Sequence, residues 1–336
     1  MNTESNLPSL SGADLRTHRI YTVDTLTALA RRQGETPWLV EDVLMASSFN
    51  VLVGDSTLGK TPLALQLAAC VVTGAPWLGL PIQKPGTVLY LNGEMDPSDL
   101  LRQWTRLSEH IGHPGQKDGF FTYNPEWGQA STVSGWDPTQ VRDLVHRIAP
   151  ALVIVDPLRV FFPEAEMDQK AFEKFRIWAR SLKCCVLVLH HRRKKDQVAG
   201  VIGLEQDPLT WLQEAAGLSH IINLTDARLG IEPPRRSTGG DLVLAGTLRG
   251  RGPMGPRYLQ RELGEDEQPM GYSVRLGLEY ISEEARALYN TLPEVFRYKD
   301  ARALLNTTSE SKVSGLLKQL CMAEVVKKER TDYRKK

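Results

Sequence analysis

The residues from Gly54 to Thr61 have the types and the spacing that hold a phosphate group. They read Gly-Asp-Ser-Thr-Leu-Gly-Lys-Thr, which matches the P-loop pattern of Gly, four variable positions, Gly, Lys and Ser or Thr. In this pattern the backbone N–H groups of the loop, and the positive N-terminal end of the helix that follows, bind phosphate oxygens. The predicted nucleotide-binding residues are Gly54, Asp55, Ser56, Thr57, Leu58, Gly59, Lys60, Thr61 and Pro62.

Three side chains would make this loop a site for ATP with Mg²⁺. The Lys60 ammonium would reach the β- and γ-phosphates, and the Thr61 hydroxyl would bind the metal ion. Asp156 directly follows an apolar run at 151–155, which is the form of a Walker B strand. An acid at the carboxyl end of a buried parallel strand lies where open α/β sheets bind ligands. Thr61 and Asp156 are therefore the predicted metal ligands.

Hydrolysis of ATP also needs a group that orients or deprotonates the attacking water. Glu94 comes shortly after an apolar run at 87–91 and is the candidate base, with Asp96 as the alternative. His190 and His191 end a further apolar run, where a polar group would face the γ-phosphate. No nearby Cys or acid completes a tetrahedral ligand set, so the two histidines are not expected to bind a metal ion.

These side chains need a fold that brings several strand ends to one edge. Short β-rich apolar runs alternate with helical patterns, which predicts βαβ units and a parallel sheet with helices on both faces. After residue 230 the runs at 242–249 and 272–280 alternate like antiparallel strands. The fold class is therefore α/β, with a mostly parallel five-stranded sheet and an antiparallel extension. The five predicted parallel strands are 49–53, 87–91, 151–155, 185–189 and 219–224.

The chain divides into three predicted segments: a polar tail with a short helix at 1–34, a P-loop domain at 35–280 and a small domain at 281–336. The last segment has 12 Lys and Arg against 8 Asp and Glu, a net charge of 12 − 8 = +4. Its pattern predicts three short helices followed by a β-hairpin, with Ser309 capping the third helix. This arrangement resembles a winged helix-turn-helix.

Several motifs together resemble the RepA-type AAA family within the RecA/DnaB-like ATPases, which includes plasmid RepA hexameric helicases. The resemblance covers roughly residues 35–250 and implies a RecA-type core, ATP hydrolysis, and rings whose active sites lie between protomers. The motifs that carry it are Thr36-Pro37-Trp38-Leu39-Val40, the P-loop with GKTPLALQLA, Gly74-x-x-Trp77-Leu78-Gly79, Gly86 to Leu91 followed by Glu94, and His190-His191-x-x-Lys194.

In such rings a neighbouring subunit supplies an arginine that stabilises charge on the transferring phosphoryl group. Arg228 matches the family's position best, and Arg249 and Arg251 are the alternatives. The resemblance therefore implies that the partner at each site is a second copy of this chain, in a ring that is expected to be a hexamer.

Two basic stretches are candidates for binding DNA. Positive charge that follows the paired histidines could couple the state of the nucleotide to the grip on single-stranded DNA, in a salt-sensitive way. The C-terminal domain could bind duplex DNA through its third helix, or it could dock a protein instead. A solvated basic loop is the alternative for the first stretch. The candidate DNA-binding residues are Arg192, Arg193, Lys194, Lys195, Lys312, Lys318, Lys327 and Lys328.

Composition limits the class of protein. Among its 336 residues, 41% are hydrophobic and 24% are charged, as in ordinary soluble domains, and the net charge of +1 gives the whole molecule no general affinity for polyanions. The start of the chain lacks a basic and apolar signal pattern, and no apolar run has the length of a membrane span. The four cysteines form no CxxC pair, so reduced thiols in the cytoplasm, with no membrane partner, are expected.

The preferred interpretation is an ATP-hydrolysing ring motor on DNA, a RepA-like helicase that serves a plasmid, a phage or another mobile element. The alternative is an ATP-dependent assembly or loader that binds DNA without unwinding it. A small-molecule phosphotransferase fits less well, because no lid-like arginine-rich segment or second substrate pocket is evident in the sequence.

Overall fold

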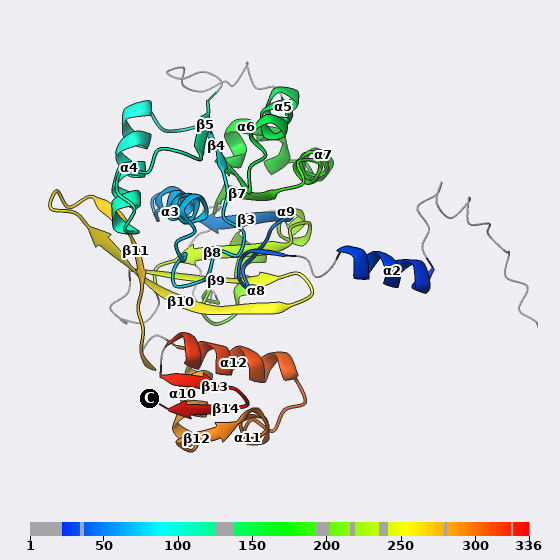
Figure 1. Ribbon diagram of the computed structural model, residues 1–336, viewed down its shortest axis with the longest axis vertical. Coiled ribbons are helices and arrows are strands. Elements are labelled where there is room, and N and C mark those ends of the chain that lie inside the picture. The colour runs from blue at the N-terminus through cyan, green and yellow to red at the C-terminus, as the bar shows by residue number, and fades with distance from the viewer. Residues whose placement is uncertain are drawn as a thin grey trace, which may run out of the picture. The chain divides into compact units, whose positions relative to one another are not determined.

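The computed structural model describes residues 22–33, 37–124, 138–192, 202–215, 219–234, 241–278, 281–323 and 325–335 (Figure 1). The chain divides into two units, Met1–Pro37 and Trp38–Lys336. The first unit contributes helix α2 (Val23–Gln33), which confirms the helix predicted near the N-terminus. All other described elements belong to the second unit.

A single sheet forms the centre of the second unit, and within the described residues it has nine strands. Its order is β11-β10-β9-β8-β3-β7-β6-β4-β5, and neighbours from β8 to β5 run parallel, whereas β9, β10 and β11 pair antiparallel. The mostly parallel sheet with an antiparallel extension is therefore confirmed. The parallel strands are β3 (Phe49–Gly54), β4 (Val88–Asn92), β5 (Phe120–Tyr123), β6 (Leu152–Asp156), β7 (Cys185–His191) and β8 (Ala227–Glu232), and the antiparallel strands are β9 (Leu242–Leu248), β10 (Gly252–Leu263) and β11 (Pro269–Val274).

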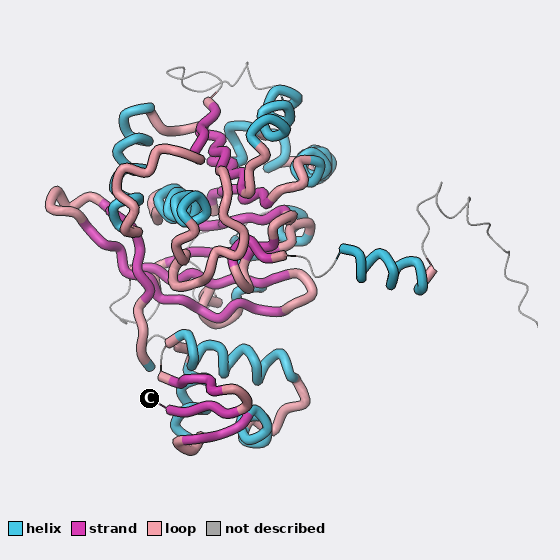
Figure 2. Tube along the Cα trace, in the orientation of Figure 1, coloured by secondary structure: helices cyan, strands magenta, loops and turns pink. Residues whose placement is uncertain are grey.

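Helices cover both faces of this sheet, as the buried apolar strands require. Two helices and the small antiparallel pair of β1 and β2 pack on one face, and the helices between β5 and β8 pack on the opposite face (Figure 2). The first face carries α3 (Lys60–Thr73), α4 (Pro97–His110), β1 (Trp38–Val40) and β2 (Leu44–Met45); the second carries α5 (Pro138–Ile148), α6 (Leu158–Phe161), the 3-10 turn η1 (Pro163–Glu166), α7 (Gln169–Ser181), α8 (Pro208–Ala215) and α9 (Ser219–Asn223).

One predicted strand is wrong. Residues 219–224 do not join the sheet, because Ser219–Asn223 form helix α9. Ile221 and Ile222 are both fully buried, and a short apolar run of this kind fits a buried helical turn as well as a strand. The strand on that side is β8, which follows directly.

The parallel part of the sheet also has more strands than predicted. β5, at the edge of the sheet, has partly exposed side chains and no continuous apolar run that would predict it. The parallel part therefore has six strands among the described residues, rather than five. In the extension, β11 ends at Val274, so only the first residues of the strand predicted at 272–280 belong to it.

The C-terminal segment has its own small apolar core, which includes Leu288, Phe296, Val313 and Tyr333. It consists of three helices and a three-stranded antiparallel sheet whose strand order is β12-β14-β13. The Ser309 hydroxyl accepts a hydrogen bond from the Lys312 N–H, which confirms the predicted cap. The elements are α10 (Glu283–Thr291), β12 (Val295–Arg297), α11 (Tyr298–Leu304), α12 (Glu310–Met322), β13 (Val326–Glu329) and β14 (Asp332–Lys335).

Helix α12 also packs against β10 of the large sheet. No helix within the described ranges has the length and apolar character needed to cross a membrane.

Candidate functional site

The P-loop lies at the carboxyl end of β3, where strand pairing brings together the other predicted groups. Gly54 is the last residue of β3 and pairs with His191 at the end of β7. Asn92, at the end of β4, pairs with Asp156 at the end of β6. Parallel strands end at one edge, so the sheet itself places all these side chains close to one another.

Gly59 occupies a position that only glycine fits. It is the residue before helix α3 and has φ +89°, in the left-handed region that side chains disfavour. A Cβ atom there would lie 2.0 Å from the Tyr272 hydroxyl, which comes from β11. The loop can therefore turn into α3 and keep its N–H groups accessible at the N-terminus of that helix.

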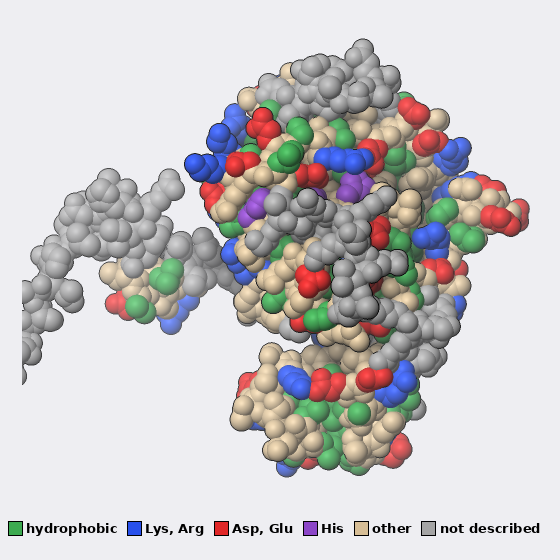
Figure 3. Space-filling view, turned by 180° about the vertical axis from the view of Figure 1, so that it is seen from behind, with side chains coloured by type: hydrophobic (Ala, Val, Ile, Leu, Met, Phe, Trp, Pro, Cys, Tyr) green, Lys and Arg blue, Asp and Glu red, His purple; other side chains and the backbone are tan. Residues whose placement is uncertain are grey.

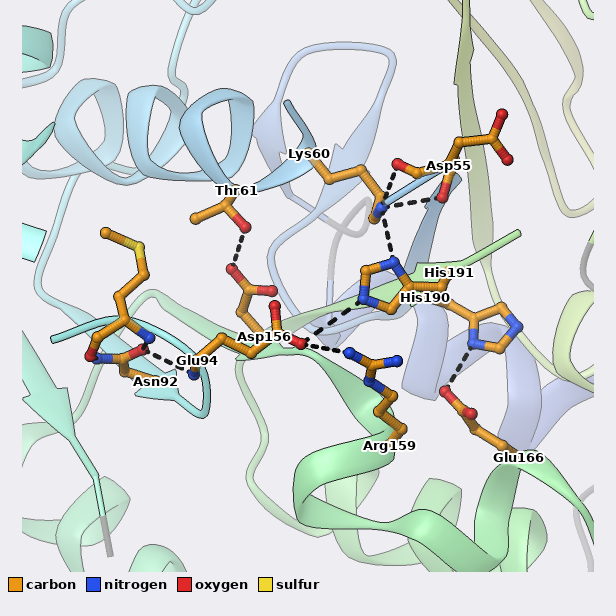
Figure 4. A network of polar contacts seen from close by, with 12 residues as sticks. Asp55, Lys60, Thr61, Asn92, Glu94, Asp156, Arg159, Glu166, His190 and His191 are labelled. Atoms are coloured by element: carbon orange, nitrogen blue, oxygen red, sulfur yellow. Dashed lines mark hydrogen bonds and ion pairs between the residues drawn. The ribbon is translucent and has the colours of Figure 1, made fainter. Parts of the chain in front are cut away.

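Lys60 lies inside the turn of the loop (Figure 4). Its Nζ donates to the carbonyl oxygens of Gly54 at 2.9 Å and Asp55 at 2.8 Å, and lies 3.2 Å from Nδ1 of His191. Burial lowers the pKa of this ammonium to about 8, although the nearby acids Asp156 and Glu94 oppose the shift. The positive charge is thus held where phosphate oxygens would bind.

Thr61 and Asp156 are joined by a hydrogen bond. The Thr61 hydroxyl donates to Oδ2 of Asp156 at 2.7 Å, and the buried Tyr90 hydroxyl donates to the same oxygen at 2.6 Å. Burial raises the pKa of Asp156 above its ordinary value, although these two hydrogen bonds oppose the shift. The fully buried Tyr90 was not predicted, although it lies on the strand that precedes Glu94.

The oxygen donors of Thr61 and Asp156 fit a Mg²⁺ ion. Mg²⁺ in phosphate sites takes one or two carboxylates, and waters and phosphate oxygens complete its shell. Across the described residues no cluster of three or more His, Cys, Asp or Glu side chains could hold a metal by itself.

A tight turn after β4 fixes the backbone at Glu94. The Asn92 side-chain oxygen accepts hydrogen bonds from the N–H groups of Glu94 at 3.3 Å and Met95 at 2.9 Å. The Gly93 N–H donates to the carbonyl of Asp156 at 2.8 Å, and a Cβ at Gly93 would lie 2.7 Å from Val160. The candidate base is thus attached to the strand that carries the candidate metal ligand.

The Glu94 carboxylate lies between two nitrogen donors. Its Oε1 is 3.8 Å from Nε2 of His191 and accepts a hydrogen bond from Nη2 of Arg159 at 2.8 Å. His191 first, and then Arg159, lower the pKa of Glu94 to about 2, against the effect of burial. Glu94 is therefore ionised at neutral pH, as a proton acceptor must be.

The two histidines point to different places because successive side chains on a strand alternate between faces. His191 faces Lys60 and Glu94, whereas Nδ1 of the buried His190 lies 3.1 Å from Oε1 of Glu166 in η1 (Figure 4). The structure brings His191 into the cluster with the P-loop and does not bring His190 there.

Arg228 does not reach the P-loop of its own chain. It pairs with Val51, three residues before Gly54, and its side chain is half-buried. Burial, followed by the nearby Arg249, lowers the pKa of Arg228, and its Nε has no hydrogen-bond partner among the described residues. Arg249 donates to the carbonyl of Asn223, and Arg251 lies over the Trp38 ring.

The predicted DNA-binding residues differ in their surroundings. The guanidinium carbon of Arg192 lies 5.1 Å from the centroid of the Trp211 ring, and its Nη1 lies 4.0 Å from Oε2 of Glu232. These contacts hold the side chain of Arg192, the first residue of the basic stretch. The other three residues of that stretch, Arg193, Lys194 and Lys195, lie outside the described residues. On the face drawn in Figure 3, basic and acidic side chains are interspersed.

In the C-terminal segment, Lys312 forms an ion pair with Glu284 at 2.5 Å. Lys318 forms an ion pair with Asp42, which lies in the turn between β1 and β2. Lys327 and Lys328 lie on the exposed hairpin of β13 and β14. The Lys327 side chain is 63% exposed and pairs with Glu329 of the same strand.

Besides Tyr90, two further site contacts were not predicted from the sequence. Arg159 stands three residues after Asp156, a spacing that could have placed it at the same edge. Tyr272 is 1% exposed, and its backbone N–H and C=O bond the side chain of Gln66 in α3 at 2.9 Å each. No sequence signal links Tyr272 to a loop more than 200 residues before it.

A family model described as an AAA domain matches residues 16–197, which is more than half of the chain and includes the P-loop, Glu94, Asp156 and both histidines. No curated protein matches the chain.

Proposed function

The chain belongs to the family of AAA-domain proteins, and from this premise we propose that it is an ATP-driven ring motor on DNA, a helicase of the RepA type. The observation that supports the ATP-hydrolysing part of this proposal is the cluster at the edge of the sheet. There, the buried Lys60 and Asp156, the Thr61 hydroxyl and the ionised Glu94 surround the turn into α3.

The proposed reaction is attack by water on the γ-phosphate of ATP. Lys60 and the N–H groups of the loop bind the phosphates, and Glu94 accepts a proton from the water. When bound by Thr61 and Asp156, Mg²⁺ would neutralise charge on the phosphate oxygens. The bond between the γ-phosphorus and the β–γ bridging oxygen breaks, ADP leaves, and the Lys60 cation offsets the negative charge on the phosphate oxygens.

Assembly as a ring, with six copies as the proposed number, accounts for the position of Arg228. This arginine lies on β8, away from its own P-loop, so it would have to act in the site of a neighbouring subunit. Mixed rings test this idea. Arg228→Ala subunits keep an intact P-loop site, and Glu94→Gln subunits keep an intact Arg228. Each variant alone should be nearly inactive, whereas a mixture of the two should recover part of the ATP turnover if the neighbour supplies the arginine; no recovery in any mixture contradicts a finger supplied by the neighbour.

We further propose that the C-terminal segment is a winged helix that contacts DNA. Its order of helix, strand, two helices and two strands supports this assignment. Because Lys312, Lys318 and Lys327 are engaged with acids, Lys328 of the hairpin, whose ammonium lies over the Tyr333 ring, is the better candidate for phosphate contact.

The hydrolysis step is tested with Glu94→Gln, which keeps the size and polarity of the side chain but cannot accept a proton at neutral pH. General bases typically contribute about 10²- to 10⁴-fold, so turnover of ATP should fall by about that factor. Binding of a fluorescent ATP analogue should remain within about twofold of wild type, because Lys60 and the loop supply the binding. Hydrolysis at the wild-type rate would remove Glu94 from the mechanism.

The motor step is tested by strand displacement on a forked duplex over a range of salt concentrations. Displacement that requires ATP and is lost in Glu94→Gln supports the helicase. Turnover that single-stranded DNA stimulates, without displacement at any salt concentration, contradicts it and favours the loader that binds without unwinding. The mass of the assembly with and without nucleotide reports whether a closed ring of six subunits forms.

A further inference from the structure

We propose that Arg159 is a positioning residue for the reaction: it anchors one carboxylate oxygen of Glu94 and leaves the other oxygen to accept the proton from water. This inference rests on the proposed ATP hydrolysis and adds a residue to it that the sequence did not indicate.

Arg159 reaches Glu94 because of where its helix starts. β6 ends at Asp156, Pro157 caps the short helix α6, and Arg159 is the second residue of that helix. The Arg159 side chain thus starts at the same sheet edge as Asp156 and meets Glu94, which follows the neighbouring strand β4. The contact is short, with 2.8 Å between Nη2 and Oε1 (Figure 4).

The two nitrogen donors around Glu94 share a single oxygen atom. Arg159 donates to Oε1, and Nε2 of His191 is 3.8 Å from the same atom. Within the described part of the chain, no group forms a hydrogen bond or ion pair with Oε2 of Glu94. A carboxylate held by one oxygen has a fixed direction, and its second oxygen keeps its lone pairs for a proton.

His191 lies near the same oxygen, with its Nε2 at 3.8 Å and without a hydrogen bond to it among the described residues. The Lys60 ammonium has donors only, so Nδ1 of His191 accepts from it and the ring proton lies on Nε2, which faces Glu94. A chain of contacts therefore runs from Lys60 through His191 to Glu94 and ends at Arg159. It connects the group that binds the phosphates to the group that takes the proton.

The alternative is that Arg159 is a surface ion pair without a role in the reaction. Its side chain is 55% exposed and that of Glu94 is 39% exposed, so the pair contributes little to folding. Substitution of Arg159 should therefore leave the protein folded, and any loss of activity would come from the position and charge of Glu94.

The experiment compares Arg159→Gln, Arg159→Lys and the control Arg297→Gln. In the C-terminal segment, Nε of Arg297 lies 2.9 Å from Oδ1 of Asp332, and the Arg297 side chain is 60% exposed. This ion pair is similar in length and exposure to that of Arg159 and involves no residue of the candidate site. Because small misplacements of a reacting group can cost up to about 100-fold, we expect Arg159→Gln to lower kcat about tenfold and to change KM for ATP less than about twofold. Arg159→Lys should recover most of the rate, and the control should equal wild type.

A double variant shows whether Arg159 acts through Glu94. In Glu94→Gln, a further change of Arg159 to Gln should alter the residual rate less than about twofold, because residues that act as a unit are not additive. An undiminished tenfold loss in that background, or a rise in KM without a fall in kcat, overturns the proposal. The pH profile gives an independent sign: without the Arg159 cation the pKa of Glu94 rises, so the acidic fall in kcat moves to higher pH.

The two proposals fail in different ways. If Glu94→Gln hydrolyses ATP normally, the proposed base is wrong. If Glu94→Gln is inactive while Arg159→Gln has wild-type kcat and an unchanged pH profile, the proposed function stands and the role of Arg159 is wrong.

Discussion

Charged side chains have different partners at the P-loop and in the C-terminal segment at 281–335. At the P-loop, Lys60 bonds backbone carbonyls and Asp156 bonds the hydroxyls of Thr61 and Tyr90. In the C-terminal segment, Lys312 and Lys318 bond carboxylates. Neutral dipoles therefore hold the charges of Lys60 and Asp156, whereas acids neutralise the charges of Lys312 and Lys318.

The charged residues of the two regions also differ in how deeply they are buried. The Lys60 and Asp156 residues are 4% and 5% exposed, whereas the Lys312 and Lys318 side chains are 45% and 44% exposed. A charge that is buried and oriented by dipoles interacts strongly with a ligand, because little water screens it. Half-exposed ion pairs are screened and contribute at most about 1 kcal/mol each. The number of basic residues in a region therefore says less about a binding site than the groups to which each one is bonded.

Among the residues that distinguish these two regions, the largest effect is expected at Thr61. Thr61→Val keeps the shape of the side chain and removes the hydroxyl that bonds Asp156 and would bind Mg²⁺. Loss of a well-placed polar group in an active site costs about 10²- to 10³-fold in kcat, and turnover measured against Mg²⁺ concentration should fall by about this factor. The control is Thr73→Val on the same helix, whose hydroxyl donates to the carbonyl of Ala69 and accepts from the N–H of Ala75, and does not bond Asp156. Equal activity and Mg²⁺ dependence in the two variants would contradict the comparison.

Gly59→Ala tests whether the P-loop geometry is held by its packing. The added Cβ would meet the Tyr272 hydroxyl in a backbone conformation with positive φ. Strain and overlap together should lower the free energy of unfolding by about 3 kcal/mol, measured by urea unfolding.

Gly79→Ala is the matched control for this substitution. Gly79 also has positive φ, but no atom lies within 4 Å of the added Cβ. It should lose only the backbone term, about 1 kcal/mol. Equal losses in both variants would show that the contact with Tyr272 has no consequence.

DNA binding should distinguish the two kinds of lysine within the C-terminal segment. Each phosphate contact contributes a slope of about −0.9 to log K against log salt, so Lys328→Ala should weaken duplex binding several-fold and reduce the slope by about 1. Lys318→Ala should leave both quantities nearly unchanged, because its partner is Asp42. Fluorescence anisotropy of a labelled duplex at several salt concentrations measures both; a larger loss from Lys318→Ala would reverse the assignment.

The smallest effect concerns pH. The pKa of Glu94 is held at about 2, so its carboxylate is ionised throughout the range from pH 5 to 8 and no acidic fall in kcat from Glu94 is expected there. His191→Phe removes the largest cause of this lowering, and the pKa should rise toward about 4.3, the ordinary value for Glu. At pH 4.5 the kcat of the variant should then fall to about half to two-thirds of its own value at pH 7, as the base becomes protonated. A flat profile for the variant would mean that Arg159 alone keeps Glu94 ionised.

Local order along the chain made much of the site predictable. The P-loop spacing, the strand before it and the helix after it are all within about 25 residues, and α3 begins at Lys60 and ends before Gly74 as its pattern indicates. Asp156 and Glu94 could be placed because each follows a strand, and parallel strands share one edge. The run at 219–224 could not be assigned correctly, because its few apolar residues suit a buried helix as well as a strand.

The sequence by itself determined the phosphate loop, the alternation of strands and helices, and the set of acids and histidines at the strand ends. Only the tertiary structure decided that His191 rather than His190 faces Lys60, that Arg159 anchors Glu94, and that Lys318 meets an acid. The physical reason is that motif spacing and hydrophobic period act over a few residues. The partner of a side chain depends instead on which distant segments pack beside it, as Tyr272 does beside Gly59.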